Sequence, residues 1–460
     1  MNRYVIVGNG VAGVRAAAAI LRRDPEAQVD ALTDEVHPFY LRPQLPTYVA
    51  GRVGEDALRG RTTEPLDERR FNLRLGVRAT AVETDQHLVR LSGGETLGYD
   101  RLVIATGAVP QRLGMANEDA RGVVRLKTLE DARRVRLLAQ EARRVVVVGS
   151  GIFGLELLDG LAGRGLKATY LVSEERFWPE ALDPTASRLA AADLRAAGVD
   201  LRFDSRLDEI RVRSGEVVAA VDATGELFEC QILGIGVGYA PAVDFLAASG
   251  IETDRGILVD ERLSTSAPDV YAAGDAAQLR QPLPGTSGIS VRWHNAWQQG
   301  HVAGGNAAGL AVPFPATVTT TSTRLFGRDF AVLGEGHAPA GDGLTEVTGP
   351  YPRAGIYKRL VSREGRLTGA LLYGDVHEAT ELIGYVRDGT PTADLPRALM
   401  DRLFGTEGAG GAVRGVVCPS CKLELPLPAG AGHGDLLTCA ACGIEMRLQR
   451  RGGRLVGVAV

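Results

Sequence analysis

The sequence predicts an α/β protein with two Rossmann-like dinucleotide-binding domains, an α+β domain and a small all-β metal ribbon. Three observations lead to this prediction: a strand–glycine–helix pattern at residues 4–21, the same pattern at residues 143–154, and two Cys-x-x-Cys pairs beyond residue 417. The composition agrees, because 45% hydrophobic and 23% charged residues are typical of a globular chain. A length of 460 residues suffices for about three domains.

The first glycine pattern follows a short run of β-branched residues and precedes an alanine-rich helical stretch. In such a turn Gly8 lets the chain reverse sharply, Gly10 lets the backbone approach a pyrophosphate, and Gly13 lets the helix pack on the strand. Val11 and Ala12 open the helix, whose free N–H groups and dipole favour an anion. The sequence therefore predicts a dinucleotide site at this turn.

Two acidic residues follow the next expected strand, at residues 28–32. Asp34 and Glu35 stand about 20 residues beyond the glycine turn, where a dinucleotide fold places an acid against the ribose hydroxyls. Glu35 is the favoured ribose acceptor of the two. The alternative interpretation is that both carboxylates are solvated loop charges.

The pattern at residues 143–154 predicts a second dinucleotide site. A run of four valines leads into Gly149, Gly151 and Gly154, and Ile152 and Phe153 begin the following helix. One match to G-x-G-x-x-G is weak evidence, but two copies, each after a strand and before a helix, imply two bound dinucleotides.

Three further segments carry a family resemblance: YLRP at residues 40–43, YDRLVIATGAVP at 99–110, and TSAPDVYAAGD at 265–275. With the two turns they resemble the flavoproteins of glutathione reductase type, in the branch that contains rubredoxin and ferredoxin reductases and the flavin part of NAD(P)H-dependent nitrite reductase. The resemblance implies FAD at the first turn and NAD(P)H at the second. It also implies that the NAD domain is inserted into a discontinuous FAD domain.

Disulfide reductases of that family carry a redox-active cysteine beside the flavin, but this chain has no cysteine between Met1 and Glu229. Thiolate attack on a substrate is therefore disfavoured there, and direct electron transfer is implied. The segment at 40–43 is similar to the Y-x-R-P element of the cysteine-free branch. By resemblance Arg42 lies close to the isoalloxazine as a catalytic cation; the alternatives are a phosphate-binding or a surface ion-pair arginine.

The resemblance also implies further FAD contacts. Ala79 matches a position whose backbone binds adenine. The small residues at 105–107 allow the backbone to approach the cofactor closely. Asp275, after Gly274, is placed to bond the ribityl hydroxyls. The implied contacts are Ala79, Ala105, Thr106, Gly107, Gly274 and Asp275.

On the NAD(P)H side, Glu156 matches a family position near the nicotinamide and flavin and could hold the carboxamide as a catalytic residue; otherwise it is a plain helix residue. Ser173 occupies the place of the family's usual acid, so Glu174 is expected to bind the adenosine ribose, which favours NADH. Arg176 leaves NADPH open. Gly236 belongs to the turn that ends this domain.

The wording of residues 357–375, YKRL followed by GALLYGD, resembles the third domain of the nitrite reductase branch, which often forms a dimer interface. A homodimer is therefore one expectation. The expected divisions are a first FAD segment at 1–112, the NAD(P)H domain at 113–245, a second FAD segment at 246–312, an α+β interface domain at 313–404, a flexible linker at 405–412 and the metal ribbon at 413–460.

Four of the five cysteines, Cys418, Cys421, Cys439 and Cys442, have the spacing of a tetrahedral metal site. Two Cys-x-x-Cys turns can bring four thiolates to about 2.3 Å from a zinc ion. Iron suits the same ligands. Zinc is favoured, because the first turn lacks a following glycine and the aromatic residues expected around a rubredoxin-like iron are missing.

Charge and hydropathy exclude several partners. The net charge of −4 gives no electrostatic basis for binding nucleic acid or an anionic membrane. No signal peptide or uninterrupted apolar stretch of about 18 residues is present, so the cytoplasm is the expected location.

The resemblance therefore implies an FAD-dependent oxidoreductase that passes electrons from NAD(P)H to a redox protein, such as a ferredoxin, a rubredoxin or a nitrite reductase partner. One alternative is an NADH oxidase that reduces oxygen. Another is an NADH-sensing flavoprotein whose metal ribbon recruits a partner.

Overall fold

The computed structural model describes residues 2–59, 66–176, 178–281, 288–315, 318–338, 343–348, 355–404, 415–421, 423–428, 430–439, 444–451 and 454–459. Cys442 and the predicted linker at 405–412 lie outside these residues.

The first nucleotide-binding sheet is parallel and has the strand order β19-β7-β1-β2-β3. Its central strand β1 pairs with β2 on one side and β7 on the other. Segments far apart in sequence therefore share one sheet, as the discontinuous domain requires. The strands are β1 (Arg3–Val7), β2 (Gln28–Thr33), β3 (Phe71–Leu75), β7 (Arg101–Ile104) and β19 (Val270–Ala272).

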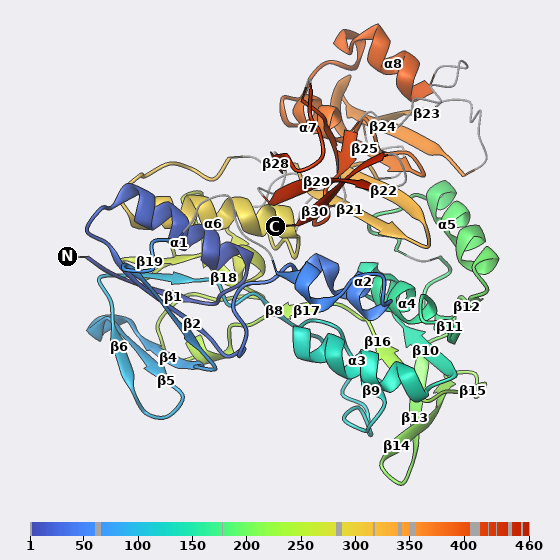
Figure 1. Cartoon of the computed structure of the whole chain (residues 1–460), viewed down its shortest axis with the longest axis horizontal. Helices are drawn as coiled ribbons and strands as arrows, with labels where there is room; N and C mark the ends of the chain where they lie inside the picture. Colours follow the sequence, from blue (N-terminus) through green and yellow to red (C-terminus); the bar gives the residue numbers. More distant parts are fainter. Residues whose placement is uncertain are drawn as a thin grey trace.

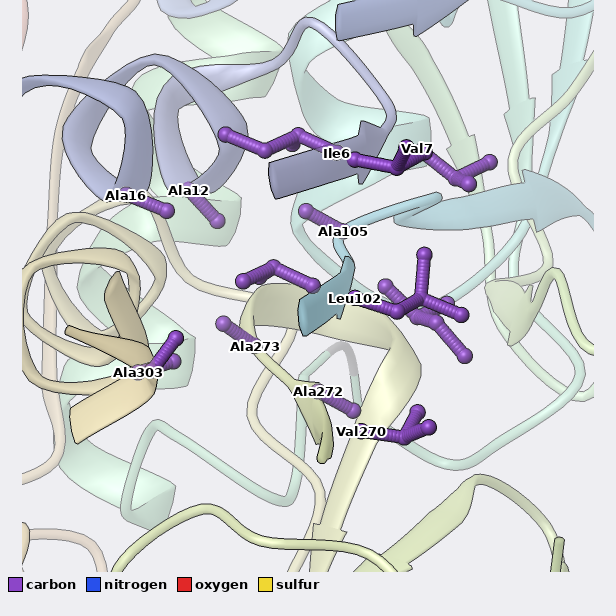
Figure 2. Packing of buried hydrophobic residues seen from close by; sticks show 14 of the residues in the cluster. Ile6, Val7, Ala12, Ala16, Leu102, Ala105, Val270, Ala272, Ala273 and Ala303 are labelled. Carbon is purple, nitrogen blue, oxygen red and sulfur yellow. The ribbon is translucent and has the colours of Figure 1, made fainter. Parts of the chain in front are cut away.

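Helices α1 (Val11–Arg23) and α6 (Trp293–Ala307) lie against each other, with α1 entering directly from the first glycine turn. A Cβ added at Gly300 or Gly304 of α6 would lie 2.2 or 2.4 Å from the carbonyl oxygens of Ala12 and Ala16. Only glycine allows this approach, and Figure 2 shows the small alanine side chains at the contact. The close packing fixes the direction of the first glycine turn.

The second sheet, also parallel, has the order β12-β11-β10-β16-β9. Its strands are β9 (Val123–Val124), β10 (Arg144–Val148), β11 (Lys167–Leu171), β12 (Asp200–Arg202) and β16 (Ile232–Ile235), and its helices are α3 (Leu129–Glu141), α4 (Ile152–Ala162) and α5 (Pro184–Ala196). Thr128 caps α3 reciprocally with Asp131. This reciprocal cap fixes where α3 begins.

Smaller sheets and short helices pack around the two parallel sheets and connect the two nucleotide-binding units that these sheets form. The antiparallel strands are β4 (Ala79–Glu83), β5 (Leu88–Leu91) and β6 (Thr96–Gly98); β13 (Leu207–Arg213), β14 (Glu216–Asp222) and β15 (Leu227–Glu229); and β8 (Ala108–Pro110) with β17 (Tyr239–Pro241). A parallel pair is β18 (Ile257–Val259) with β20 (Ala277–Leu279). The short helices are η1 (Arg42–Gln44), α2 (Leu45–Val49), η2 (Glu55–Leu58), η3 (Thr84–Gln86), η4 (Asp244–Leu246) and η5 (Gly274–Ala276), while η6 (Thr392–Asp394) belongs to the third unit. The β8–β17 pair is where the chain passes from one unit to the other and back.

The third unit contains an antiparallel sheet of order β21-β22-β25-β24-β23 with two helices. Its elements are β21 (Thr320–Leu325), β22 (Arg328–Gly334), β23 (Leu344–Thr348), β24 (Tyr357–Arg363), β25 (Arg366–Tyr373), α7 (Ala379–Arg387) and α8 (Arg397–Phe404). These strands and helices give the unit the α+β composition that the sequence predicted.

The C-terminal cysteine module, residues 415–459, consists of two small antiparallel sheets. Its strands are β26 (Gly415–Val417), β27 (Glu424–Pro426), β28 (Leu436–Thr438), β29 (Glu445–Arg451) and β30 (Arg454–Ala459). Figure 1 shows these dark red strands beside the orange third unit. The module also shares one buried cluster with Leu41 of the first segment and with the third unit's sheet.

Among the described residues, no helix combines the length and the apolar character needed to cross a membrane.

Candidate functional site

One cavity of about 1230 Å³ runs between the units. Its wall includes the first glycine turn, the start of α4 after the second glycine turn, strand β21 and the cysteine module. Because the first glycine turn and the helix start that follows the second glycine turn line the same cavity, this cavity is the candidate redox site.

The first glycine turn has the geometry that a nucleotide cradle requires. Gly8 has φ +115°, and a Cβ there would lie 2.1 Å from the Ala105 carbonyl oxygen. A Cβ at Gly13 would lie 1.9 Å from the Gly8 carbonyl oxygen. Gly10, in contrast, faces open space, with no atom within 4 Å of an added Cβ. The open position lies where a pyrophosphate needs room, so the turn fits FAD.

The second turn repeats this arrangement. Gly149 has φ +134°, and its added Cβ would lie 2.3 Å from the Gly236 carbonyl oxygen. A Cβ at Gly236 would in turn lie 2.4 Å from the Gly154 backbone, whereas Gly151 has no atom within 4 Å. Both turns therefore combine a positive-φ glycine pressed against a backbone carbonyl with one open glycine, which fits two nucleotides.

The predicted cavity residues separate into two groups. Those that line the cavity are Gly8, Gly10, Val11, Ala12, Asp34, Glu35, Arg42, Ala79, Ala105, Thr106, Gly107, Ile152, Phe153, Glu156, Gly274 and Asp275. The glycines Gly13, Gly149, Gly151, Gly154 and Gly236 shape the turns, and Glu174 follows β11; none of these six lines it.

Glu35 and Arg42, which the sequence assigned to different ends of FAD, contact each other. The Arg42 Nη2 lies 2.5 Å from the Glu35 Oε1, and the Tyr40 hydroxyl donates to the Glu35 Oε2 at 2.7 Å. Asp34 lies instead 3.5 Å from the Nε of Arg78. Glu35 therefore orients Arg42. The sequence analysis did not predict this ion pair, because it assigned the two residues separate roles.

Arg42 is also tied to neighbouring elements. Its Nη1 donates to the Tyr40 hydroxyl at 2.6 Å and to the Lys127 carbonyl at 3.2 Å. Burial lowers the pKa of Arg42, but Tyr40 and Glu35 raise it by more, so the net shift is upward. The guanidinium remains a fixed cation with 26% of the side chain exposed.

Lys127 adds a second cation that the sequence analysis missed. Its Nζ lies 3.4 Å from the Asp275 Oδ2 and 4.7 Å from the centre of the Tyr239 ring. Burial lowers the pKa of Lys127; the Asp275 carboxylate raises it and Arg42 lowers it, so the net shift is downward from the usual lysine value. The one feature of the sequence that could have drawn attention to Lys127 is that lysine is rare in this chain, which has only four.

Glu156 and Phe153 project from the first turn of α4 into the cavity wall. The Phe153 ring meets Tyr239 edge to face, with ring centres 4.1 Å apart. The Tyr239 hydroxyl donates to the Leu126 carbonyl at 2.5 Å. Burial and then Glu156 raise the pKa of Tyr239, so the phenol stays protonated. An aromatic pair and a carboxylate therefore mark the second nucleotide's side of the cavity.

Three of the four predicted metal ligands converge. The sulfur atoms of Cys418, Cys421 and Cys439 lie within 4.8 Å of one another, and all three residues are buried. The Cys421 and Cys439 sulfurs are 3.5 Å apart, close to the about 3.8 Å edge of a tetrahedron with 2.3 Å metal–sulfur bonds. The donor set fits a thiophilic divalent ion.

The remaining cysteine does not belong to this site. Cys230 is buried, and burial raises its thiol pKa to about 12, so it is not available as a thiolate.

The cavity also contains residues that the sequence did not single out. Trp293 opens α6, and its buried indole Nε1 has no hydrogen-bond partner among the residues that the structure describes. Third-unit and module residues complete this side of the cavity: Thr320, Thr321, Ser322, Ser420, Cys421 and Leu423. Cys421 was predicted as a metal ligand but not as a cavity residue, and no local pattern indicated the other five, because they reach the cavity only through tertiary packing.

Comparison with known proteins supports the two-nucleotide interpretation. The model of the family described as pyridine nucleotide-disulphide oxidoreductase matches residues 2–300. A rubredoxin-NAD(+) reductase from Pseudomonas putida is 29% identical over 312 residues, which are 68% of this chain and 81% of that protein. Putidaredoxin reductase CamA from the same species is 32% identical over 288 residues, 61% of this chain and 68% of that protein.

The solved structures include a covalent complex of putidaredoxin reductase with putidaredoxin. It matches with a TM-score of 0.77 and 25% identity, covering 85% of this chain and 94% of that chain. The family model ends at residue 300, before the third unit and the cysteine module.

Proposed function

The chain belongs to the pyridine nucleotide-disulphide oxidoreductase family, and we propose that this NAD(P)H-dependent oxidoreductase passes electrons through FAD to a separate redox protein. The supporting observation is a single cavity shared by the first glycine turn and the start of α4. No cysteine from the first 229 residues is present to relay electrons as a thiol.

FAD is held by the first turn, with its pyrophosphate at Gly10 and the N-terminus of α1, and with its adenosine toward the Asp34–Glu35 side. FAD supplies the conversion from the two electrons of a nicotinamide to single electrons. Asp275 accepts hydrogen bonds from the cofactor's hydroxyl groups. Ala79 and residues 105–107 line the cofactor's path.

Lys127 and Arg42 supply positive charge to the cofactor. Both are partly buried, and Lys127 contacts Asp275 while Glu35 holds Arg42. A fixed cation in a water-poor site favours negative charge on a bound group more strongly than one in water does. The two cations therefore stabilise the phosphates and the reduced form of the cofactor.

The second turn holds NAD(P)H, with Glu156 orienting the carboxamide and Phe153 packing near the nicotinamide. NADH is the preferred form. Glu174 is the expected ribose acceptor; its carboxylate accepts a bond from the Ser173 hydroxyl at 2.9 Å and would repel a 2′-phosphate. One N–H of Arg176 donates to the Leu182 carbonyl at 2.5 Å, and its other N–H groups leave NADPH as the alternative. Comparing KM values for NADH and NADPH tests this preference.

The cysteine module holds one zinc ion, with Cys442 as the fourth ligand, and iron is the alternative. The ion stabilises a module too small for a large apolar core. Elemental analysis of the purified protein distinguishes the two metals, since one zinc per chain supports the assignment and one iron contradicts it. The third unit remains a candidate homodimer surface, which light scattering tests.

The acceptor is a one-electron redox protein of the rubredoxin or ferredoxin class. The names of the two relatives and of the solved complex support this class. The experiment compares NADH oxidation with oxidised rubredoxin, with a [2Fe–2S] ferredoxin and with oxygen alone. A protein acceptor that turns over much faster than oxygen supports the proposal; oxygen turning over fastest identifies an oxidase. Slow turnover with every acceptor favours the sensor interpretation.

A further inference from the structure

The first cysteine turn, residues 418–421, forms part of the wall of the redox cavity. Ser420 and Cys421 line it together with Leu423, next to Trp293 of α6 and Ser322 of β21. The metal module is therefore part of the redox site rather than an appendage at a distance from it.

This turn is held in place from two directions. The Gln44 side-chain amide donates to the Pro419 carbonyl, and the Ser322 hydroxyl donates to the Cys421 carbonyl. Leu41 shares a buried apolar cluster with Cys418, Cys421 and Leu423. Hydrogen bonds and apolar contacts of this kind give the turn a defined position on the cavity.

The opposite side of the module is anchored away from the cavity. The Thr380 hydroxyl donates to the Glu424 carbonyl at 3.0 Å. The His377 Nε2 lies 3.0 Å from the Glu424 carboxylate. None of these three residues lines the cavity. Changes at this anchor can thus alter the module's position without changing any cavity side chain.

We propose that the cysteine module shields the redox site and thereby determines which oxidants the protein serves. This inference rests on the proposed function. Dioxygen must reach a reduced flavin to take two electrons and two protons and form hydrogen peroxide, whereas single electrons can pass to a docked protein through a thin wall. Closing a site against small molecules suppresses such side reactions. By excluding oxygen from the reduced flavin, the module directs the electrons to the protein acceptor.

The test weakens the anchor and measures how readily iodide and oxygen reach the bound flavin. Thr380→Val combined with His377→Asn removes the anchor's side-chain contacts with Glu424. Glu381→Gln is the matched control, because Glu381 follows Thr380 on α7 but contacts Arg402 of α8 instead of the module. The full-length proteins, loaded with FAD and metal, are compared by iodide quenching of flavin fluorescence and by the rate at which oxygen reoxidises the NADH-reduced protein.

Losing two anchoring contacts is expected to raise the population with the module displaced by about tenfold. The extent of iodide quenching and the rate of peroxide-forming reoxidation should then rise by about the same factor in the double variant. Both should stay unchanged in the control. Equal or lower values of either quantity in the double variant would overturn the proposal. A ferric-thiolate absorption band that NADH bleaches would overturn it too, because the module would then be an acceptor itself.

The quenching measurement needs no turnover, so it separates this inference from the proposed function. A wild-type protein whose flavin is shielded but not reduced by NADH would contradict the proposed function alone. A protein that NADH reduces normally, but whose quenching does not respond to the anchor, would contradict the shield alone.

Discussion

The ammonium of Lys127 lies 3.4 Å from the carboxylate of Asp275, although 148 residues separate them in sequence. Lys127 precedes the capped start of α3, and Asp275 belongs to η5 beside the first sheet. This pair therefore joins the inserted unit to the discontinuous one at the cavity.

Lys127→Met should make the bound FAD harder to reduce, because it removes a cation beside the cofactor. A change of 1.4 kcal/mol corresponds to about 30 mV for two electrons, and we expect a potential lower by about that amount. Equilibration with dyes of known potential measures it. Lys167→Met, on the exposed start of β11, is the matched control. An unchanged or higher potential would contradict the role of Lys127.

Two glycines of the first turn should respond differently to alanine. A methyl group at Gly10 enters open space, so Gly10→Ala should fold normally but lose FAD on gel filtration. At Gly13 the added carbon would meet the Gly8 carbonyl, so Gly13→Ala should lower the free energy of unfolding by about 1–3 kcal/mol. Urea unfolding and flavin absorbance separate the outcomes; full FAD retention by Gly10→Ala would count against the cradle.

The contact between His377 and the module should weaken at high pH. Asp375 and then Glu424 raise the pKa of His377 to about 10. Lys358 also contacts Asp375, and it contacts Glu378 as well. A raised histidine pKa stabilises the fold fully below the unfolded value of about 6.5, and this stabilisation is lost as the pH rises through about 10.

The check on this pH dependence is the Tm difference between wild type and His377→Gln. The wild type should be the more stable protein at pH 6, and the difference should shrink by pH 10.5. A difference that grows with pH would show that the imidazolium does not stabilise this contact.

Metal removal should expose the module's cysteines. Bound thiolates react slowly with a disulfide reagent, so a strong chelator should raise the number of fast-reacting thiols by about four. Cys230 should stay unreactive because it is buried and its thiol pKa is raised to about 12. Four thiols that react equally fast before chelation would contradict a metal site.

Local patterns in the sequence predicted the two glycine turns well, because their geometry depends on residues that are neighbours in the chain. Gly8 and Gly149 both have the positive φ that the turn requires. The antiparallel third unit was also predictable, since its strands β24 and β25 follow each other directly.

Tertiary packing determines what the sequence could not predict. Lys127 and Trp293 reach the cavity from separate elements, and no spacing connects them to the glycine turns. The position of Cys421 beside Ser322 depends on how the module packs after a glycine-rich segment, whose composition specifies no direction. Glu35 and Arg42 were each singled out from the sequence, but their ion pair became evident only in the structure.

The most direct test of the account mixes NADH-reduced, FAD-loaded protein with oxidised rubredoxin or ferredoxin under anaerobic conditions in a stopped-flow spectrometer. We predict that flavin absorbance returns as the acceptor is reduced, with about two acceptor molecules reduced per NADH. A protein isolated without flavin that cannot take it up, or a reduced flavin that no one-electron protein reoxidises, would contradict the account.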